Sequence, residues 1–431
     1  MNEPNVAAGT GLPRRLGLWA ATLIGVGLIL GAGIYVLLGV AAGEAGNAVW
    51  LSFLIAAFVA ALTGFSYARL ARLKPKNAPE FQYIGMAFGK IPAFLSGWMM
   101  LWATVISSAA VALGFGSYLE HLSGLPHVGG ALVLIILSSA VVFIGVGESV
   151  ILSGILTFAA AAGLIFIIVI GVPSVGQANL FEMPRGIAGV IGAAPLVFFA
   201  YLGFEAIANL SEEMKSPARD LPKAILLALG ISAVIYLLVS ISAVSVLGWQ
   251  GLSGSSAPLA AVASRILGAK ADLILTLIAL AATGNTVLLL LFTSSRAMWA
   301  MSCAGALPMT FCVIGEGRRT PWFAIMAVGG IAGLFVVFRN IEDIANYTNF
   351  ATLLVFAGVN AGAIKIFGSG KSGTLKQILA NIVPPVLGAL TSLWLAVTIG
   401  WRAALAGGVL LTSGVLFHLI MERRGIKAPK R

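Results

Sequence analysis

Residues 16–41 read LGLWAATLIGVGLILGAGIYVLLGVA, an apolar stretch without a charged side chain. A helix crosses the hydrocarbon core of a bilayer with about 20 mostly apolar residues, and this stretch is longer than that. Four glycines, at positions 25, 27, 31 and 33, fall within nine residues near its middle. Glycine lowers helix stability by about 1 kcal/mol relative to alanine. The stretch therefore predicts a membrane-spanning helix with a weak point.

The composition of the whole chain agrees with a membrane protein. Of its 431 residues 59% are hydrophobic and 10% are charged, whereas soluble proteins carry roughly 25% charged residues. These values argue against a soluble globular enzyme, a disordered chain and a disulfide scaffold. His121, His127 and His418 are the only histidines, too few for a metal cluster, so we expect neither a metal nor a cofactor.

Further stretches of the same kind follow, and we predict an all-α polytopic membrane protein with twelve transmembrane helices. Runs this long and apolar favour helices over barrel strands, which alternate over about 10 residues. No signal peptide is expected before the first span. The predicted spans are Leu16–Ala41, Ala48–Ala71, Ile91–Leu119, Val128–Ile144, Ser149–Val172, Ile187–Leu210, Leu221–Leu247, Ala271–Met301, Trp322–Phe338, Ile344–Phe367, Ile378–Ile399 and Trp401–Met421.

Basic residues predict the orientation of these spans. With both termini in the cytoplasm, 21 of the 26 lysines and arginines fall on the cytoplasmic side, as the positive-inside rule requires. This distribution explains the net charge of +11, so we expect no nucleic-acid partner. Cys303 and Cys312 fall in a predicted cytoplasmic segment, where we expect free thiols rather than a disulfide.

Two spans carry signs of an interrupted helix. In the first, Gly31 and Gly33 favour a break, although small residues also serve close helix packing. In the sixth, Pro195 and Gly203 disturb the hydrogen-bond ladder. Glu205 follows as the one ionisable residue well inside a predicted span, a position typical of functional residues. The alternative for Glu205 is a structural carboxyl, protonated or hydrogen-bonded to backbone that the break sets free.

Interrupted helices at matching positions of two halves are the sequence sign of an inverted-repeat transporter, with its binding site at the breaks. Freed amides at a half-helix N-terminus attract an anion, and freed carbonyls attract a cation. We therefore predict a zwitterion site, with the substrate carboxylate on the amides of Gly31, Ala32, Gly33 and Ile34 and its ammonium on carbonyls of Ile29, Phe199 and Leu202; Ala200 and Gly203 complete the predicted site.

Five motifs near these residues resemble those of one transporter family, in the same order and on the same spans. They read GAGI, FAYLGFE, EEMKSPARDLP, SRAMWAMSCAGALP and NFATLL, at Gly31–Ile34, Phe199–Glu205, Glu212–Pro222, Ser295–Pro308 and Asn349–Leu354. Over nearly its whole length the chain resembles the amino acid–polyamine–organocation (APC) superfamily, of the amino acid permease type.

The resemblance implies two inverted repeats of five helices, followed by two C-terminal helices. The expected repeats cover residues 16–172 and 187–367, the last two helices cover 378–421, and cytoplasmic tails cover 1–15 and 422–431. It also implies an amino acid or related amine as the substrate, moved by alternating access. Phe199 matches the family's aromatic gate, and Glu205 matches a carboxylate that several members tie to proton coupling.

The sequence departs from some proton-coupled relatives in the fifth span. Where those relatives carry a lysine, this chain has Ala160, which puts that form of proton coupling in doubt. Sodium would instead need oxygen ligands, and we consider Thr283, Asn285 and Thr286 as ion or pocket residues. Such side chains also form ordinary hydrogen bonds between helices.

The expected function is secondary transport of neutral L-amino acids across the cell membrane, coupled to protons. The reason is that Glu205 is the only acid well inside a predicted span, which leaves no second carboxylate there for a cationic substrate. An exchanger and a sodium symporter are the alternatives, and a channel is a distant one. An intramembrane enzyme would need a nucleophile–base pair or a metal set, so we expect no catalysis.

Two connecting segments are predicted to be helical. Glu80–Lys90 has an amphipathic pattern and is expected to lie at the membrane interface, with Phe81, Ile84 and Phe88 on its apolar side. Ala257–Gly268 is expected to form a helix on the outer side before the eighth span. The alternative for both segments is that they are simple connectors.

Overall fold

The computed structural model describes residues 16–74, 78–315, 320–338, 340–368 and 375–423, so the predicted tail at 1–15 and most of the one at 422–431 lie outside the described residues. Within these ranges the chain is helical, with one isolated bridge between Leu16 and Met214. The α-helices are α1 (Leu18–Ile29), α2 (Ala32–Ala45), α3 (Val49–Leu73), α4 (Pro79–Phe88), α5 (Lys90–Ser123), α6 (His127–Ile144), α7 (Val146–Gly171), α8 (Gly186–Phe198), α9 (Pro217–Ser253), α10 (Pro258–Leu267), α11 (Ala269–Cys303), α12 (Trp322–Phe335), α13 (Ile341–Gly368), α14 (Leu375–Thr398) and α15 (Trp401–Arg423).

Short 3₁₀ segments join several of these helices. They are η1 (Gly46–Ala48), η2 (Val172–Ser174), η3 (Phe199–Tyr201), η4 (Ala206–Glu213), η5 (Met309–Cys312) and η6 (Val336–Phe338). Two of them, η3 and η4, replace the α-helix in the second half of the predicted sixth span, so this span is irregular where the sequence predicts an interruption.

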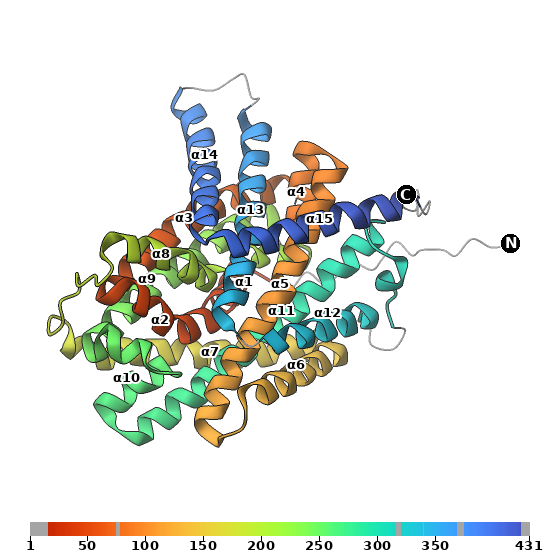
Figure 1. Cartoon of the computed structure of the whole chain (residues 1–431). Helices are drawn as coiled ribbons and strands as arrows, with labels where there is room; N and C mark the ends of the chain where they lie inside the picture. Colours follow the sequence, from red (N-terminus) through yellow and green to blue (C-terminus); the bar gives the residue numbers. More distant parts are fainter. Residues whose placement is uncertain (1–15, 75–77, 316–319, 339, 369–374, 424–431) are drawn as a thin grey trace.

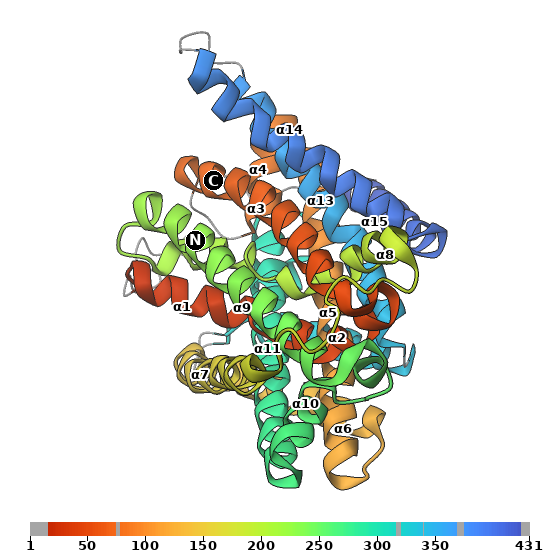
Figure 2. The same ribbon diagram turned by 90° about the vertical axis from the view of Figure 1, so that its left-hand side faces the viewer.

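The helices form one bundle whose centre holds α3, α5, α9, α11 and α13. Helix α3 packs along α9, α5 packs along α11, and α13 packs against both α5 and α14. Figure 1 shows that the C-terminal end of α13 and the N-terminal end of α14 lie side by side and project from the rest of the bundle, and Figure 2 shows the projection of α14 in the turned view. An aromatic cluster in the core joins the first half of the chain to the second, since the ring of Tyr67 packs edge-on against Phe204 and Phe356.

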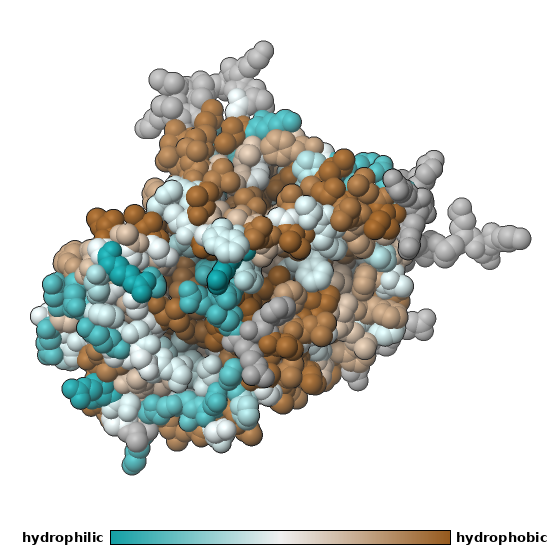
Figure 3. All heavy atoms as spheres, in the orientation of Figure 1, coloured by the Kyte–Doolittle hydropathy of each residue, from teal (hydrophilic) through white to brown (hydrophobic). Residues whose placement is uncertain are grey.

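The outer surface carries many large apolar side chains. Phe158 is 79% exposed and Val397 is 80% exposed, and Figure 3 shows wide hydrophobic areas on the face that it draws. A soluble monomer rarely exposes apolar patches of this extent. The exposed apolar helices therefore agree with a protein that is surrounded by lipid.

Ten helical runs in the described residues are long and apolar enough to cross a membrane. The sequence predicts twelve spans, and two differences account for the lower number. The second half of the first span runs on into the second span as Gly33–Leu73, and the ninth span holds a helix of only 14 residues, Trp322–Phe335. The polytopic, all-α class is confirmed, whereas the number twelve stays a prediction.

Both predicted connecting helices are present, but Glu80, expected on the polar side of the first one, is buried. Helix α4 lies between α3 and α5, with Glu80 only 5% exposed and Phe88 41% exposed. Glu80 turns inward because the hydroxyl of Tyr67 donates a hydrogen bond to it, which offsets part of the cost of its burial. Helix α10 lies within the predicted Ala257–Gly268 segment.

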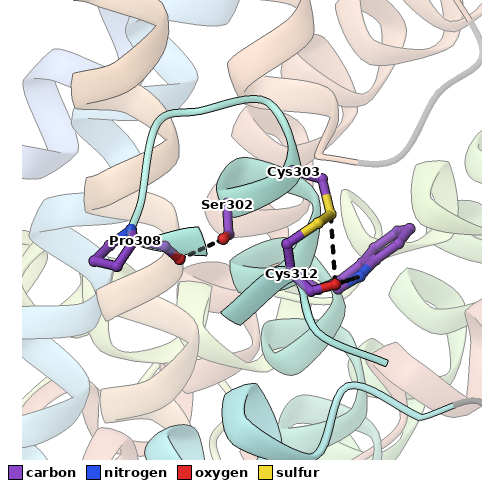
Figure 4. Close-up of a disulfide and its surroundings, with 5 residues drawn as sticks. Ser302, Cys303, Pro308 and Cys312 are labelled. Atoms are coloured by element: carbon purple, nitrogen blue, oxygen red, sulfur yellow. Dashed lines mark hydrogen bonds between the residues drawn. A yellow bond between two sulfur atoms is a disulfide. The ribbon is translucent and has the colours of Figure 1, made fainter. Parts of the chain in front are cut away.

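The prediction of free thiols is also wrong, because Cys303 and Cys312 form a disulfide (Figure 4). The loop after α11 returns to the end of that helix, where the Ser302 hydroxyl donates to the Pro308 carbonyl and the Trp299 indole donates to the Cys312 carbonyl. The two Cα atoms are thereby 5.1 Å apart, a distance that suits a disulfide. A cytoplasmic location by itself does not predict this return of the chain.

Candidate functional site

The first predicted helix break is present at Leu30 and Gly31. Helix α1 ends at Ile29, Gly31 has φ −83° and ψ −144°, and α2 begins at Ala32. The amides of the first turn of α2, which include Gly33 and Ile34, have no carbonyl acceptor within their own helix. The positive end of a half-helix therefore lies inside the bundle.

The second break lies between η3 and η4. Leu202 is extended, with φ −60° and ψ 144°, and Gly203 has φ +117°, which strongly favours glycine. The prediction that Pro195 interrupts this span is not met, because α8 continues through it to Phe198. The carbonyl of Pro195 accepts a hydrogen bond of 2.7 Å from the Asn349 side chain. Gly203 is therefore the glycine at the break.

The two breaks lie against each other. A Cβ atom on Gly33 would be 2.3 Å from the Cα atom of Ala200, and one on Gly203 would be 2.8 Å from the Leu28 carbonyl oxygen. The hydroxyl of Tyr236 in α9 is within hydrogen-bonding distance of the carbonyl oxygens of Ile29 and Ala200, one from each break. Two segments that are about 170 residues apart in sequence thus form one backbone-lined centre.

A cavity of about 30 Å³ lies at this centre. Such a volume holds one or two water molecules. Its walls come from α1, α2, the sixth span, α5 and α11, and no charged side chain is among the described residues that line it. Eight predicted site residues belong to the lining: Ile29, Gly31, Gly33, Phe199, Ala200, Leu202, Gly203 and Thr286; Leu28, Ser107, Val111, Ala206 and Leu290 complete it.

Other predicted residues lie near the cavity without lining it. Ile34, Thr283 and Asn285 are buried in the surrounding packing, and Ala32 stands at the start of α2 with its side chain outside the described part. Of the predicted ammonium-binding carbonyls, that of Phe199 accepts from the Leu202 amide at 3.2 Å. A carbonyl oxygen has two lone pairs, so one internal partner leaves an acceptor site on it.

Glu205 is 6% exposed, and its carboxylate accepts hydrogen bonds from the Gly203 amide at 2.9 and 3.1 Å. The carboxyl therefore binds backbone that the break sets free, which is the structural arrangement that the sequence left open. Glu205 also lines a second cavity, which shares Ala206 and Leu290 with the central one. Its position next to the centre is compatible with a coupling role as well.

The candidate ion residues lie along α11 beside the first break. Thr283 and Thr286 donate to carbonyls of their own helix, and the Thr286 hydroxyl lies against Gly31. The amide nitrogen of Asn285 donates to the Thr157 hydroxyl of α7 at 3.0 Å, while its oxygen is buried with no partner among the described residues. Asn285 thus makes the interhelical hydrogen bond and keeps an unused oxygen.

Three functional candidates were missed by the sequence analysis. Tyr236 bridges the two breaks, Glu80 lines the second cavity, and Tyr67 donates to Glu80. A tyrosine in the middle of the apolar seventh span is the one sequence signal that could have pointed to Tyr236. At Ala160, where some relatives have a lysine, the backbone carbonyl accepts a hydrogen bond of 2.7 Å from the hydroxyl of Tyr35.

Comparison with known proteins agrees with this architecture. The family model described as "Amino acid permease" matches residues 16–417. A methylthioribose transporter of Bacillus subtilis is 30% identical over 96% of this chain and 94% of its own length. A branched-chain amino acid permease of the same organism is 27% identical over the same shares. The vacuolar cationic amino acid transporter 2 of Arabidopsis thaliana is 30% identical over 81% of this chain and 59% of its own length.

The family model covers far more than half of the chain, and the motifs at both helix breaks fall within the matched range. A transport protein in a membrane setting also fits the exposed apolar helices and the cavity between broken helices. The chain therefore belongs to the amino acid permease family of the APC superfamily.

Proposed function

We propose that this protein is a secondary transporter of neutral L-amino acids, that it works by alternating access, and that protons drive it through Glu205. The observation that carries the proposal is the meeting of two helix breaks around one cavity. The first-turn amides of α2 would receive the substrate carboxylate, and the carbonyls of Ile29, Phe199 and Leu202 would receive its ammonium.

The cavity lining supports an uncharged substrate side chain. Val111, Phe199 and Leu290 are apolar, and the described lining offers no carboxylate to a cationic side chain. Leaving a cation unpaired there would be costly. The similarity to a branched-chain amino acid permease supports the same class, and leucine, isoleucine and valine are the first substrates to test.

The proposal includes twelve spans in a five-plus-five inverted arrangement, with repeats at 16–172 and 187–367. The protein would lie in the plasma membrane with both termini in the cytoplasm. The two breaks support it, since they fall in the first helix of each proposed repeat. The distribution of lysine and arginine supports the orientation.

Uptake into proteoliposomes tests the function. Purified protein is reconstituted, a pH gradient with acidic exterior is imposed, and labelled leucine, alanine, lysine and methylthioribose are supplied in separate assays. Leucine accumulation about tenfold above protein-free liposomes is expected, since a difference of one pH unit supplies a factor of ten per proton. Failure to take up or exchange any amino acid under proton or sodium gradients would refute the proposal.

A sodium symporter is the second candidate, because the buried Asn285 oxygen has no partner in the described part of the chain. Together with the Thr286 hydroxyl and first-span carbonyls it would give sodium the oxygen ligands that hard cations prefer. The same liposomes under an inward sodium gradient at equal pH separate the two. Accumulation that needs sodium and is indifferent to pH favours this candidate.

A further inference from the structure

The second cavity has a volume of about 40 Å³ and lies between α4, α5, α11 and the sixth span. Glu80 and Glu205 are both among the residues that line it, from α4 and from the second helix break. The cavity shares Ala206 and Leu290 with the central cavity. Two buried carboxyls from distant parts of the sequence therefore border one space next to the candidate substrate site.

Glu80 is tied to the second break through Tyr67 of α3. The Tyr67 hydroxyl donates to Glu80 Oε1 at 2.8 Å, which favours Oε2 as the oxygen that carries a proton. The ring of Tyr67 packs edge-on against Phe204, the residue before Glu205, with centroids 5.7 Å apart. The Ala78 amide, two residues before Glu80, donates to the side-chain oxygen of Asn209 in η4 at 3.0 Å. Helix α4 is thereby fastened to the segment that carries Glu205.

Among the described residues, no cation faces Glu80. The titratable groups that face it are Tyr67 of α3, Tyr83 of its own helix and Glu205 at the break, and the described residues that line the cavity from α5 and α11 are uncharged. A buried carboxyl without a positive partner holds its proton more tightly. Burial raises the pKa of Glu80, which lies outside the membrane-spanning segments, to about 7. Glu80 can thus gain and lose a proton near neutral pH.

We propose that Glu80 is a second proton-carrying residue of this transporter, exchanging protons with Glu205 across the cavity that they share. This inference rests on the proposed proton coupling. In the transfer, an O–H bond of the Glu205 carboxyl breaks and an O–H bond forms on the Glu80 carboxylate, and loss of that proton to the cytoplasm restores the carboxylate of Glu80. The volume of the cavity is sufficient for a water molecule to relay the proton.

The position of α4 gives the transfer a direction. This helix joins the second and third spans, which puts it on the cytoplasmic side in the proposed orientation. Glu80 then lies between Glu205 and the cytoplasm, while Glu205 borders the substrate centre. Protons released after substrate entry would leave through Glu80.

The test uses the full chain in proteoliposomes and two readouts. Net uptake under a pH gradient, with an internal pH dye, reports proton movement, and counterflow of labelled leucine at equal pH reports substrate exchange without net proton movement. The variants are Glu80→Gln, Glu205→Gln and the control Gln82→Ala on the same helix. For Glu80→Gln we expect counterflow within about twofold of wild type and a loss of net uptake of about tenfold or more. Gln82→Ala should keep both.

The outcomes separate the inference from the proposed function. If wild type shows no uptake driven by a pH gradient, the proton coupling and this inference both fail. If Glu205→Gln loses net uptake while Glu80→Gln keeps it, only the inference fails.

If Glu80→Gln does not fold, Tyr67→Phe keeps the test decisive. This variant retains the carboxyl and removes the hydrogen bond that favours its charged form. The pH at which the proton flux reaches half of its maximum should then be higher than in wild type. A pH profile of the flux that does not shift overturns the inference.

Discussion

Gly33 and Gly203 are needed for different physical reasons. Gly203 has φ +117°, a conformation that side chains with a Cβ atom rarely adopt. Gly33 lies in helix α2 and needs no unusual backbone conformation, but Ala200 leaves no space for a Cβ atom on it. The sequence pattern predicts a helix break near each glycine, but it does not show which of the two reasons applies at which glycine.

A valine at position 33 should abolish substrate binding. Its side chain would collide with Ala200 and separate the two breaks, so we expect affinity for leucine to fall by about tenfold or more. Gly192→Val in α8 is the matched control, because a Cβ atom there meets nothing within 4 Å. Binding measured by scintillation proximity should be lost in the first variant and kept in the second; normal affinity in Gly33→Val contradicts the site.

Glu205 combines a structural contact with a candidate coupling role. Glu205→Gln keeps an oxygen that accepts from the Gly203 amide but can no longer take up a proton. We expect leucine binding to persist and uptake to lose its dependence on pH. The measurement is initial uptake at several pH values between about 5 and 9. A pH profile equal to wild type would return Glu205 to a purely structural role.

At the scale of elements, α4 shows how a tertiary contact overrides a sequence pattern. The amphipathic pattern places Glu80 on the polar side of this helix, whereas the structure buries it. The hydroxyl of Tyr67 is the deciding partner. A pattern of apolar and polar residues contains no information on a hydrogen-bond partner in another helix.

This burial predicts how stability depends on pH. The pKa of Glu80 rises to about 7 in the folded protein, against about 4.3 for an unperturbed glutamate. Between these values the folded state binds more protons than the unfolded state, so stability falls as pH rises. The contribution is on the order of a few kcal/mol at most. In detergent, the unfolding temperature of Glu80→Gln should fall less between about pH 5 and pH 7 than that of wild type. The control Glu422→Gln, a change at an exposed residue, should behave like wild type.

The loop between α11 and α12 gives a second prediction at this scale. Since Cys303 and Cys312 are bonded to each other and are the only cysteines, the purified protein should not react with a maleimide before reduction. After dithiothreitol, mass spectrometry should find both residues modified. Two reactive thiols in the unreduced protein would restore the original expectation of free cysteines.

At the scale of the whole molecule, large apolar side chains lie exposed on the outer helices, as Figure 3 shows for one face, and two irregular spans meet inside the bundle. Irregular backbone is tolerated at membrane depth only where protein or a cavity covers it. Here α5, α9 and α11 surround the breaks, and the Tyr236 hydroxyl lies within hydrogen-bonding distance of a carbonyl oxygen from each break. The breaks are therefore covered within the bundle.

The proposed topology can be tested with single cysteines, in a chain whose native cysteines are replaced by serine. Gln177, after the fifth span, and Lys90, before the third, are both exposed and fall on opposite sides in the proposed orientation. An impermeant maleimide added to intact cells should label Gln177→Cys and leave Lys90→Cys unlabelled until the cells are opened. The reverse pattern would invert the orientation.

The sequence by itself determined the membrane class, the all-α architecture, the break at Gly31 and the break near Gly203, because hydropathy and glycine placement are local properties of the chain. It also singled out eight residues that line the central cavity. The tertiary structure alone decided that the two breaks touch, that Tyr236 bridges them, that Glu80 joins Glu205 at one cavity and that the cysteines pair. These features depend on contacts between residues far apart in the chain or on the return of a loop, and no local pattern specifies such contacts.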